Sequence, residues 1–207
     1  MEVLETDIDI IQSKVSIDPL VGGGSNFGTH ILTQQSASKL IYKPSIGAAI
    51  FSFAFFAVGF AVLCFAIYSF FQPISLTDGK DIMLIIFGLV FTSTGCFMFY
   101  YFYMPRVFDK QLGIYYKAHK AKLHNTRRRS SKRQVVLKSI VAIQIIGEIV
   151  SGDKGSYQSF ELNLVLNDSS RRNVVDHGNL HSIIDDAEVL SKFLNIPIWH
   201  SKSNTDQ

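Results

Sequence analysis

Two long stretches of the chain contain only uncharged, mostly apolar residues. The first runs from Ser45 to Gln72 and the second from Ile82 to Met104. A helix needs roughly 20 apolar residues to cross the hydrocarbon core of a bilayer, and both stretches are that long. A core helix of a soluble protein is shorter and keeps a polar face. The pattern therefore predicts two transmembrane helices.

The short connection PISLTDGKD predicts a tight turn between these helices. Pro73, Asp78 and Gly79 are typical turn formers. We therefore expect a transmembrane hairpin over residues 45–104, with both ends of the chain on one side of the membrane. Four tyrosines fall near the helix ends, where amphipathic rings prefer the lipid–water interface: Tyr68, Tyr100, Tyr101 and Tyr103.

After Met104 the pattern changes to short apolar segments separated by turn-forming residues. RVFD and GIYYKAHK flank KQL, and QVVLKSIVAIQIIGEIV, YQSFELNLVL and RRNVVDH follow with SGDKGS and NDSS between them. Segments rich in Val, Ile and aromatic residues between such separators are typical of antiparallel strands. FELNLVL alternates in part, which indicates one buried sheet face. We expect a small antiparallel barrel or sandwich.

The chain then predicts one amphipathic helix. Its apolar positions share a face: Ile183, Ala187, Leu190 and Leu194. The stretch SIID fits a capping box, with Ser182 as the N-cap and Asp185 reaching back. Asn195 and Pro197 predict the helix end. Trp199 is expected to anchor that end on the sheet.

The first 44 residues predict no regular structure. They are mildly acidic at first and then contain the glycine-rich VGGGSNFGTH. GGGSNFG lacks the flanking strand, helix and Lys of a phosphate loop, so no nucleotide site is expected. The expected organisation is a flexible segment over 1–44, a helix hairpin over 45–104, a soluble α+β domain over 105–200 and a polar tail over 201–207.

Composition and charge support a membrane protein and give its orientation. Hydrophobic residues make up 47% and charged residues 18% of the chain, against about 25% charged residues in average globular chains. From Arg106 to Lys138 there are eleven Lys and Arg and one acid, Asp109, whereas the connection between the helices has one Lys and two Asp. Positive charge beside a helix end marks the cytoplasmic side. We expect a multi-pass protein of a bacterial cytoplasmic (inner) membrane, with both termini in the cytoplasm.

The most basic stretch, HNTRRRSSKR, has alternative interpretations. It is explained by topology alone, or it also contacts anionic lipid headgroups, which attract basic segments by about 1 kcal/mol per Lys or Arg, or a partner. A nucleic-acid contact is not expected, because no aromatic side chains accompany the charge. The candidate contact residues are Lys117, Lys120, Lys122, Arg127, Arg128, Arg129, Lys132 and Arg133.

Inside the predicted helices, small residues recur at helical spacing. Asp, Glu, Lys, Arg and His do not occur in either stretch, which argues against a transporter or channel. Small residues let helices approach closely, either within the hairpin or against another membrane protein. The candidate packing residues are Ala54, Ala57, Ala61, Gly88, Thr92 and Cys96.

The one candidate for chemistry is VVDHGNLH. His177 and His181 have a spacing that suits zinc on a helix, and Asp176 is placed to orient His177 for acid–base work. Gly178 and Asn179 between the histidines favour a turn instead. Glu148 and Glu161 are lone acids within strands, expected to face solvent or a buried Arg. We expect no metal, no cofactor and no catalytic site.

The chain resembles bacterial membrane proteins that carry two N-terminal transmembrane helices followed by a pleckstrin-homology-like (PH-like) domain. The photosystem I assembly factor family of plastids and cyanobacteria has a similar layout. The similar places are RVFDKQLGIYY, VVLKSIVAIQI and DAEVLSKFLNIPIW. The resemblance implies a PH-like fold over 105–200, closed by one C-terminal helix, and a scaffold or assembly role without catalysis.

The sequence thus predicts a non-catalytic membrane scaffold that binds a partner membrane protein through its hairpin and its soluble domain. A regulator that reads anionic lipid headgroups through the basic stretch is the alternative. A hydrolase that uses Asp176 and His177 is a third possibility.

Overall fold

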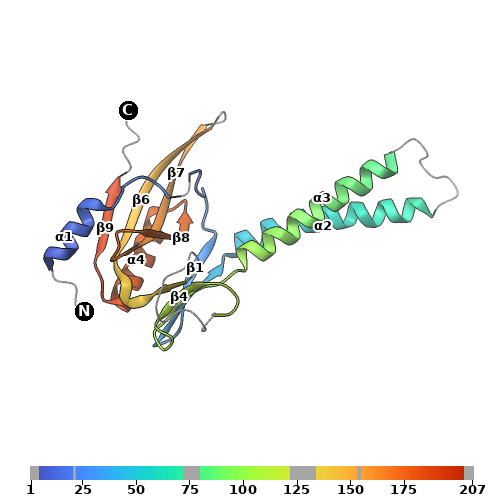
Figure 1. The fold of residues 1–207 in the computed structure, drawn as a ribbon. Helices are drawn as coiled ribbons and strands as arrows, with labels where there is room; N and C mark the ends of the chain where they lie inside the picture. Colours follow the sequence, from blue (N-terminus) through green and yellow to red (C-terminus); the bar gives the residue numbers. More distant parts are fainter. Residues whose placement is uncertain (1–4, 21, 72–79, 122–133, 153–154, 203–207) are drawn as a thin grey trace. The chain divides into compact units, whose positions relative to one another are not determined.

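The computed structural model describes residues 5–20, 22–71, 80–121, 134–152 and 155–202. The chain forms two compact units (Figure 1). The helix unit is residues 44–104. The sheet unit combines residues 1–43 with residues 105–207, so the helices are an insertion within it.

The helix unit consists of α2 (Ile46–Phe70) and α3 (Lys80–Phe102). The Ser45 hydroxyl caps α2 by accepting from the Ala48 amide. Both helices are long and apolar enough to cross a membrane. In the most apolar 18-residue segment of each helix, only 17% is buried in α2 and 11% in α3. A core helix would be mostly buried, so these two present apolar surface outward.

The two helices pack antiparallel. Gly95 lies against Phe56, and Gly88 lies against Leu63, so rising residue numbers in α2 meet falling numbers in α3. Most Phe side chains outside this contact are exposed, including Phe53, Phe60 and Phe65. The predicted turn between the helices, residues 73–79, lies outside the described residues.

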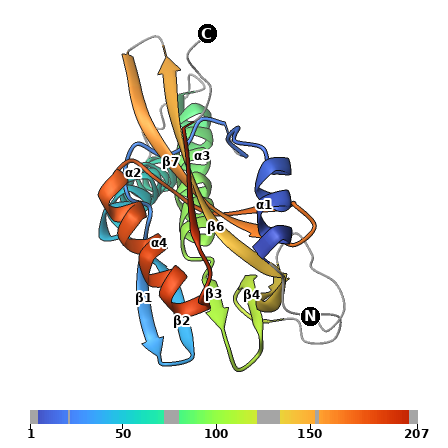
Figure 2. The ribbon, with the colours of Figure 1, turned by 90° about the vertical axis from the view of Figure 1, so that its left-hand side faces the viewer.

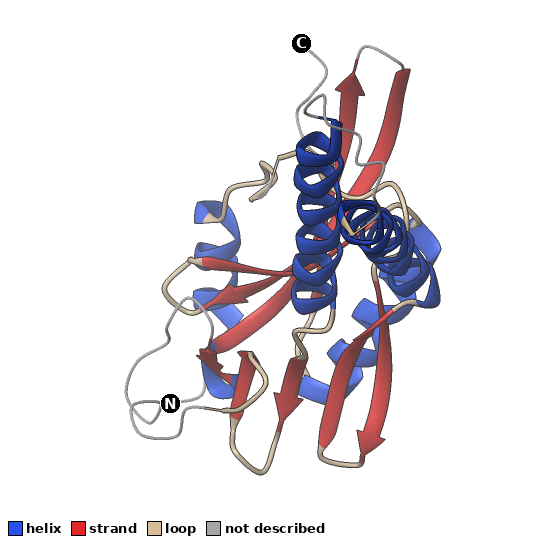
Figure 3. Cartoon of the chain, turned by 90° about the vertical axis from the view of Figure 1, so that its right-hand side faces the viewer, coloured by secondary structure: helices blue, strands red, loops and turns tan. Residues whose placement is uncertain are grey.

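The sheet unit contains a five-stranded sheet, sheet A, in which the strands follow one another in chain order (Figure 3). β2 and β3 are antiparallel neighbours, with Tyr42 opposite Arg106, although the whole helix unit separates them in the chain. The strands are β1 (His30–Ser36), β2 (Lys39–Pro44), β3 (Arg106–Asp109), β4 (Ile114–Lys117) and β5 (Gln134–Val136).

The prediction of a flexible segment over residues 1–44 is wrong. This segment forms α1 (Glu5–Lys14), β1 and β2. Leu40 and Tyr42 alternate along β2 and are fully buried, so the segment supplies part of the core. The soluble domain is therefore not limited to residues 105–200.

The second sheet, sheet B, has the order β8–β7–β6–β9. β6, β7 and β8 are antiparallel, whereas β9 is parallel to β6 because α4 (Leu180–Leu194) carries the chain back between β8 and β9. The strands are β6 (Ile140–Gly152), β7 (Gly155–Leu166), β8 (Arg171–His177) and β9 (Ile198–Lys202). A single 3-10 turn, η2 (Leu137–Ser139), separates β5 from β6.

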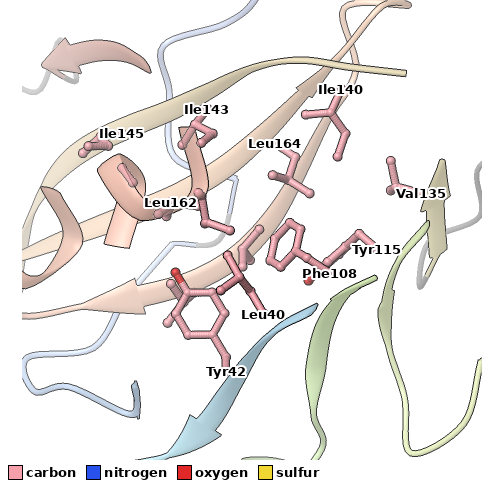
Figure 4. Packing of buried hydrophobic residues seen from close by; sticks show 14 of the residues in the cluster. Leu40, Tyr42, Phe108, Tyr115, Val135, Ile140, Ile143, Ile145, Leu162 and Leu164 are labelled. Atoms are coloured by element: carbon pink, nitrogen blue, oxygen red, sulfur yellow. The ribbon is translucent and has the colours of Figure 1, made fainter. Parts of the chain in front are cut away.

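Both sheets and α4 contribute to one hydrophobic core (Figure 4). Phe108 and Tyr115 of sheet A lie in the same cluster as Ile143 and Leu164 of sheet B and Leu190 of α4. The expected barrel is not closed, because the described strands form two separate sheets. The α+β class and the antiparallel strands agree with the sequence prediction.

The two faces of sheet B are covered by different helices, since α4 and α1 lie on opposite sides of it (Figure 2). On the α1 side, Ile11 and Val15 pack in a second cluster with Val165 and Trp199. Trp199 was predicted to anchor the end of the C-terminal helix, but it belongs to β9 and packs in the cluster with α1. β9 also takes up Ser201 and Lys202, which were expected in the polar tail.

The C-terminal helix begins and ends with identifiable caps. Asn179 is its N-cap and accepts from the Ser182 amide, so the prediction of Ser182 as the cap is wrong. Asn195 is the left-handed C-cap with φ of 57°, which confirms the predicted helix end. Ile183, Ala187 and Leu190 are buried, as the periodicity predicted.

Candidate functional site

Only two residues of the basic candidate contact lie in the described part of the chain. Lys117 ends β4, where it is half-buried opposite Arg106, and Lys120 is exposed in the loop that follows. The other candidates lie outside the described residues: Lys122, Arg127, Arg128, Arg129, Lys132 and Arg133. A lipid contact therefore stays a prediction.

The contact between α2 and α3 uses a different set of small residues from the predicted one. The fully buried small residues of α2 are Ala48, Ser52, Gly59 and Ala66. In α3, Gly88 and Gly95 are buried, and a Cβ added to Gly59 would overlap the backbone of Phe91 and Thr92. These positions lie four or seven residues apart, and a repeat of seven keeps them on the one helix face that forms a close seam.

The predicted packing residues divide between this seam and the outside. Gly88 and Thr92 lie at the contact between the helices. Ala54, Ala61 and Cys96 are exposed and Ala57 is half-buried. Packing within the helix pair is therefore the wrong interpretation for the three exposed residues.

Asp176 and His177 do not form the acid–base arrangement that their sequence positions allow. They are adjacent in β8, and neighbouring side chains of a strand point to opposite faces. The Asn173 side-chain amide donates to Asp176 over 2.7 Å, and the Asn179 backbone amide donates to His177 Nδ1 over 3.1 Å.

Burial shifts both of these residues in the direction of the neutral form. It raises the pKa of Asp176, partly offset by the hydrogen bond from Asn173, and it lowers the pKa of His177. His181 is exposed on α4. The described residues contain no group of three or more His, Cys, Asp or Glu side chains that could hold a metal ion.

A row of buried polar side chains on sheet B is the most unusual feature of the sheet unit. The strand register places Gln144 opposite Asn163, and Glu148 opposite Ser159, on the same face as Glu161. We call this set the polar row: Gln144, Glu148, Ser159, Glu161 and Asn163. Four of its members, all but Glu148, are almost completely buried.

A segment of the N-terminal region covers the polar row. Residues 16–20 and 22–24, here called the strap, follow α1 and lead toward β1 (Figure 1). Two strap amides donate to row carboxylates: Leu20 N to Glu161 over 2.9 Å and Gly23 N to Glu148 over 3.3 Å. The glycine-rich stretch GGGSNFG, which resembles a phosphate loop only in its glycines, thus directs the Gly23 amide at a carboxylate.

Strap carbonyls are also bound by side chains of sheet B. Gln144 donates to the Ser16 carbonyl over 3.1 Å, and the Tyr157 hydroxyl donates to the Gly24 carbonyl over 2.8 Å. Arg171 donates to the Asp18 carbonyl over 2.8 Å. These three hydrogen bonds and the two from the strap amides therefore all involve the backbone of the strap and none of its side chains.

Not every polar atom under the strap is satisfied. Ser159 Oγ, Asn163 Oδ1 and Glu148 Oε2 are buried and have no hydrogen-bond partner among the described residues. Buried polar atoms without partners are costly and uncommon in native structures. A Cβ added to Gly24 would overlap the Ser159 hydroxyl, so glycine is required there.

The sequence carried only weak signals for this site. Glu148 and Glu161 were expected to face solvent or a buried Arg. Instead they accept strap amides, and Glu161 also accepts from the Asn163 side-chain amide over 2.9 Å. Two acids within apolar strands and a run of glycines were visible, but nothing local linked them.

Comparison with known proteins gives no further guidance: no protein-family model, curated protein or solved structure matches this chain. The resemblance to the PH-like membrane family therefore stays a prediction.

Proposed function

We propose that the protein is a membrane-anchored binding protein that holds a partner membrane protein, with the helix unit as its anchor and the sheet unit as its recognition domain. The pairing of β2 with β3 supports the anchor most directly. Residues before α2 and after α3 form one sheet, so a chain that enters the membrane through α2 must return through α3 to the same side.

The surface of the helices supports their place in lipid. Exposed Phe, Ile and Leu side chains surround a narrow seam of small residues. Such a surface is stable in hydrocarbon, whereas in water it would form an apolar patch far larger than soluble proteins tolerate. The excess of Lys and Arg after α3 favours the cytoplasmic side for the sheet unit.

The polar row supports binding as the activity of the sheet unit. Five hydrogen bonds from one face of sheet B already hold a peptide segment by its backbone: three involve the polar row, and Tyr157 and Arg171 beside it make the other two. Side chains arranged in this way bind a chain through its backbone amides and carbonyls. A scaffold or assembly role needs this kind of contact.

Labelling of single cysteines in intact cells tests the anchor. In a background with Cys64 and Cys96 replaced by Ser, a cysteine is placed at exposed Ser13, at exposed Glu188 or at Asp78 between the helices. A membrane-impermeant maleimide should label only the third. Labelling of either sheet-unit position from outside, or different results for the two, would contradict the proposal.

Cross-linking in native membranes tests the binding role. The wild-type chain should capture the same membrane protein in repeated experiments, and a variant with Glu148→Gln and Glu161→Gln should capture much less. Glu188→Gln, on the exposed side of α4, is the matched control and should capture as much as the wild type. A capture that the double variant leaves unchanged would argue against the polar row as the binding face.

A further inference from the structure

The strap covers the polar row but buries little apolar surface that would hold it there. Its Leu20 side chain is 42% exposed, and that of Phe27, just after it, is 39% exposed. Burial of apolar area is the dominant favourable term in packing, and these two side chains supply little of it. Hydrogen bonds to the backbone are the main attachment.

From these observations we propose that the strap is a replaceable occupant, and that the polar row recognises a partner segment carrying a glycine and, close to it, a basic side chain. This inference rests on the proposed binding function and names the partner chemistry. The strap then holds the row closed until a partner segment displaces it.

The requirement for glycine follows from Ser159. Its buried hydroxyl, which has no hydrogen-bond partner among the described residues, lies where the Cβ of any residue other than glycine at position 24 would be. By contrast, no atom lies within 4 Å of a Cβ added to Gly22. An occupant therefore needs glycine over Ser159 but has room for a side chain two residues earlier.

The preference for a basic side chain follows from charge. Glu148, Glu161 and Asp176 lie on this face of sheet B, with Arg171 as a cation at its other end. Glu148 accepts the Gly23 amide through one carboxylate oxygen, while its other oxygen is buried with no partner among the described residues. An ammonium or guanidinium group carried by the occupant would supply a donor to that oxygen, where the strap supplies none. Because a Cβ at position 22 meets no atom within 4 Å, a flexible Lys side chain placed there is the probe for such a donor.

The test uses the full chain in lipid nanodiscs and two labelled peptides. The first has the sequence of residues 16–28, SIDPLVGGGSNFG, and the second is the same peptide with Gly22→Lys. The chain variant Gly24→Val cannot seat its own strap, because the Val side chain would overlap Ser159. The variant Gly22→Val is the matched control, since that position is open.

Gly24→Val should bind both peptides at least tenfold more tightly than the wild type or Gly22→Val does. The Lys peptide should bind more tightly than the unmodified one, and the difference should shrink as salt rises, because screening weakens the charge interaction. Adding Glu148→Gln and Glu161→Gln to Gly24→Val should abolish the gain. Equal binding by all variants would overturn the proposal.

A second measurement uses the wild-type chain and so does not depend on whether Gly24→Val folds. Hydrogen exchange on the wild-type chain, with and without saturating Lys peptide, should show faster exchange at the Leu20 and Gly23 amides when the peptide is bound. Unchanged exchange would overturn strap displacement. The cysteine labelling reports on the anchor separately, so a failure here leaves that part of the proposed function standing.

Discussion

Asp186 has surroundings that differ from those of an ordinary surface acid. It lies on α4, near the Tyr42 hydroxyl of β2. Burial raises its pKa to about 6; the interaction with Tyr42 offsets part of the rise, and the neighbouring Asp185 charge adds to it. The ionised form therefore costs the folded state free energy at neutral pH.

Asp186→Asn should stabilise the chain above about pH 6, because the amide keeps the shape without the buried charge. The folded pKa lies above the unfolded value of 3.8, so the penalty is absent below that value, grows between the two, and is complete above pH 6. The shift sets an upper limit of about 3 kcal/mol, and partial solvent access reduces the expected gain to about 1–2 kcal/mol.

Unfolding of the full chain in detergent, measured from pH 4 to 8, checks this prediction. Asp185→Asn removes the same charge from an exposed neighbour, and it should change stability much less. A gain by Asp186→Asn that is equally large at pH 4 would show that ionisation is not its cause.

At the scale of elements, the α2–α3 contact depends on glycines that no other residue can replace without moving a backbone. A Cβ on Gly59 would overlap Thr92 N, and one on Gly95 would overlap Phe56 N. In lipid, close packing replaces the hydrophobic effect as the main attraction between helices, so these glycines are expected to determine how strongly the pair associates.

Gly59→Val should weaken the helix pair by about 1–3 kcal/mol, since an inserted side chain in a packed contact forces the backbones apart. Ala54→Val, five residues earlier and on the exposed surface, should have little effect. Equilibrium unfolding of the full chain in mixed micelles, followed through helix content, measures both. An equal loss in the two variants would contradict the seam and favour a contact on the Ala54 face.

At the scale of the whole molecule, the sheet unit is a discontinuous domain. Its N-terminal part contributes α1, the strap, β1 and β2, and its C-terminal part contributes everything after α3. Trp199, the single tryptophan of the chain, packs in the cluster with Ile11 and Val15 of the first 15 residues. This indole therefore reports whether the two parts are assembled.

Deletion of residues 1–15 should expose Trp199 and shift its fluorescence emission to longer wavelengths. Deletion of residues 203–207 is the control and should leave the emission unchanged. A chain without residues 1–15 that keeps wild-type emission would contradict the packing of α1 on sheet B.

The sequence alone determined the elements whose signals are local. Two uncharged apolar stretches predicted α2 and α3, and the spacing of Ile183, Ala187 and Leu190 predicted the buried face of α4. The turn formers SGDKGS and NDSS separated β6, β7 and β8, whereas β1, β2 and β9 were not predicted. These patterns predict correctly because each depends on residues a few positions apart, where helix or strand geometry alone fixes which side chains share a face.

The tertiary structure decided what depends on residues distant in the chain. The pairing of Tyr42 with Arg106 made the first 44 residues part of the domain, and the fold placed two lone acids, Glu161 and Glu148, where they accept backbone amides of the strap. Likewise, only helix-to-helix packing could show that Gly59, and not Ala54, lies in the seam. Several partners could satisfy each of these groups locally, and three-dimensional packing selects one.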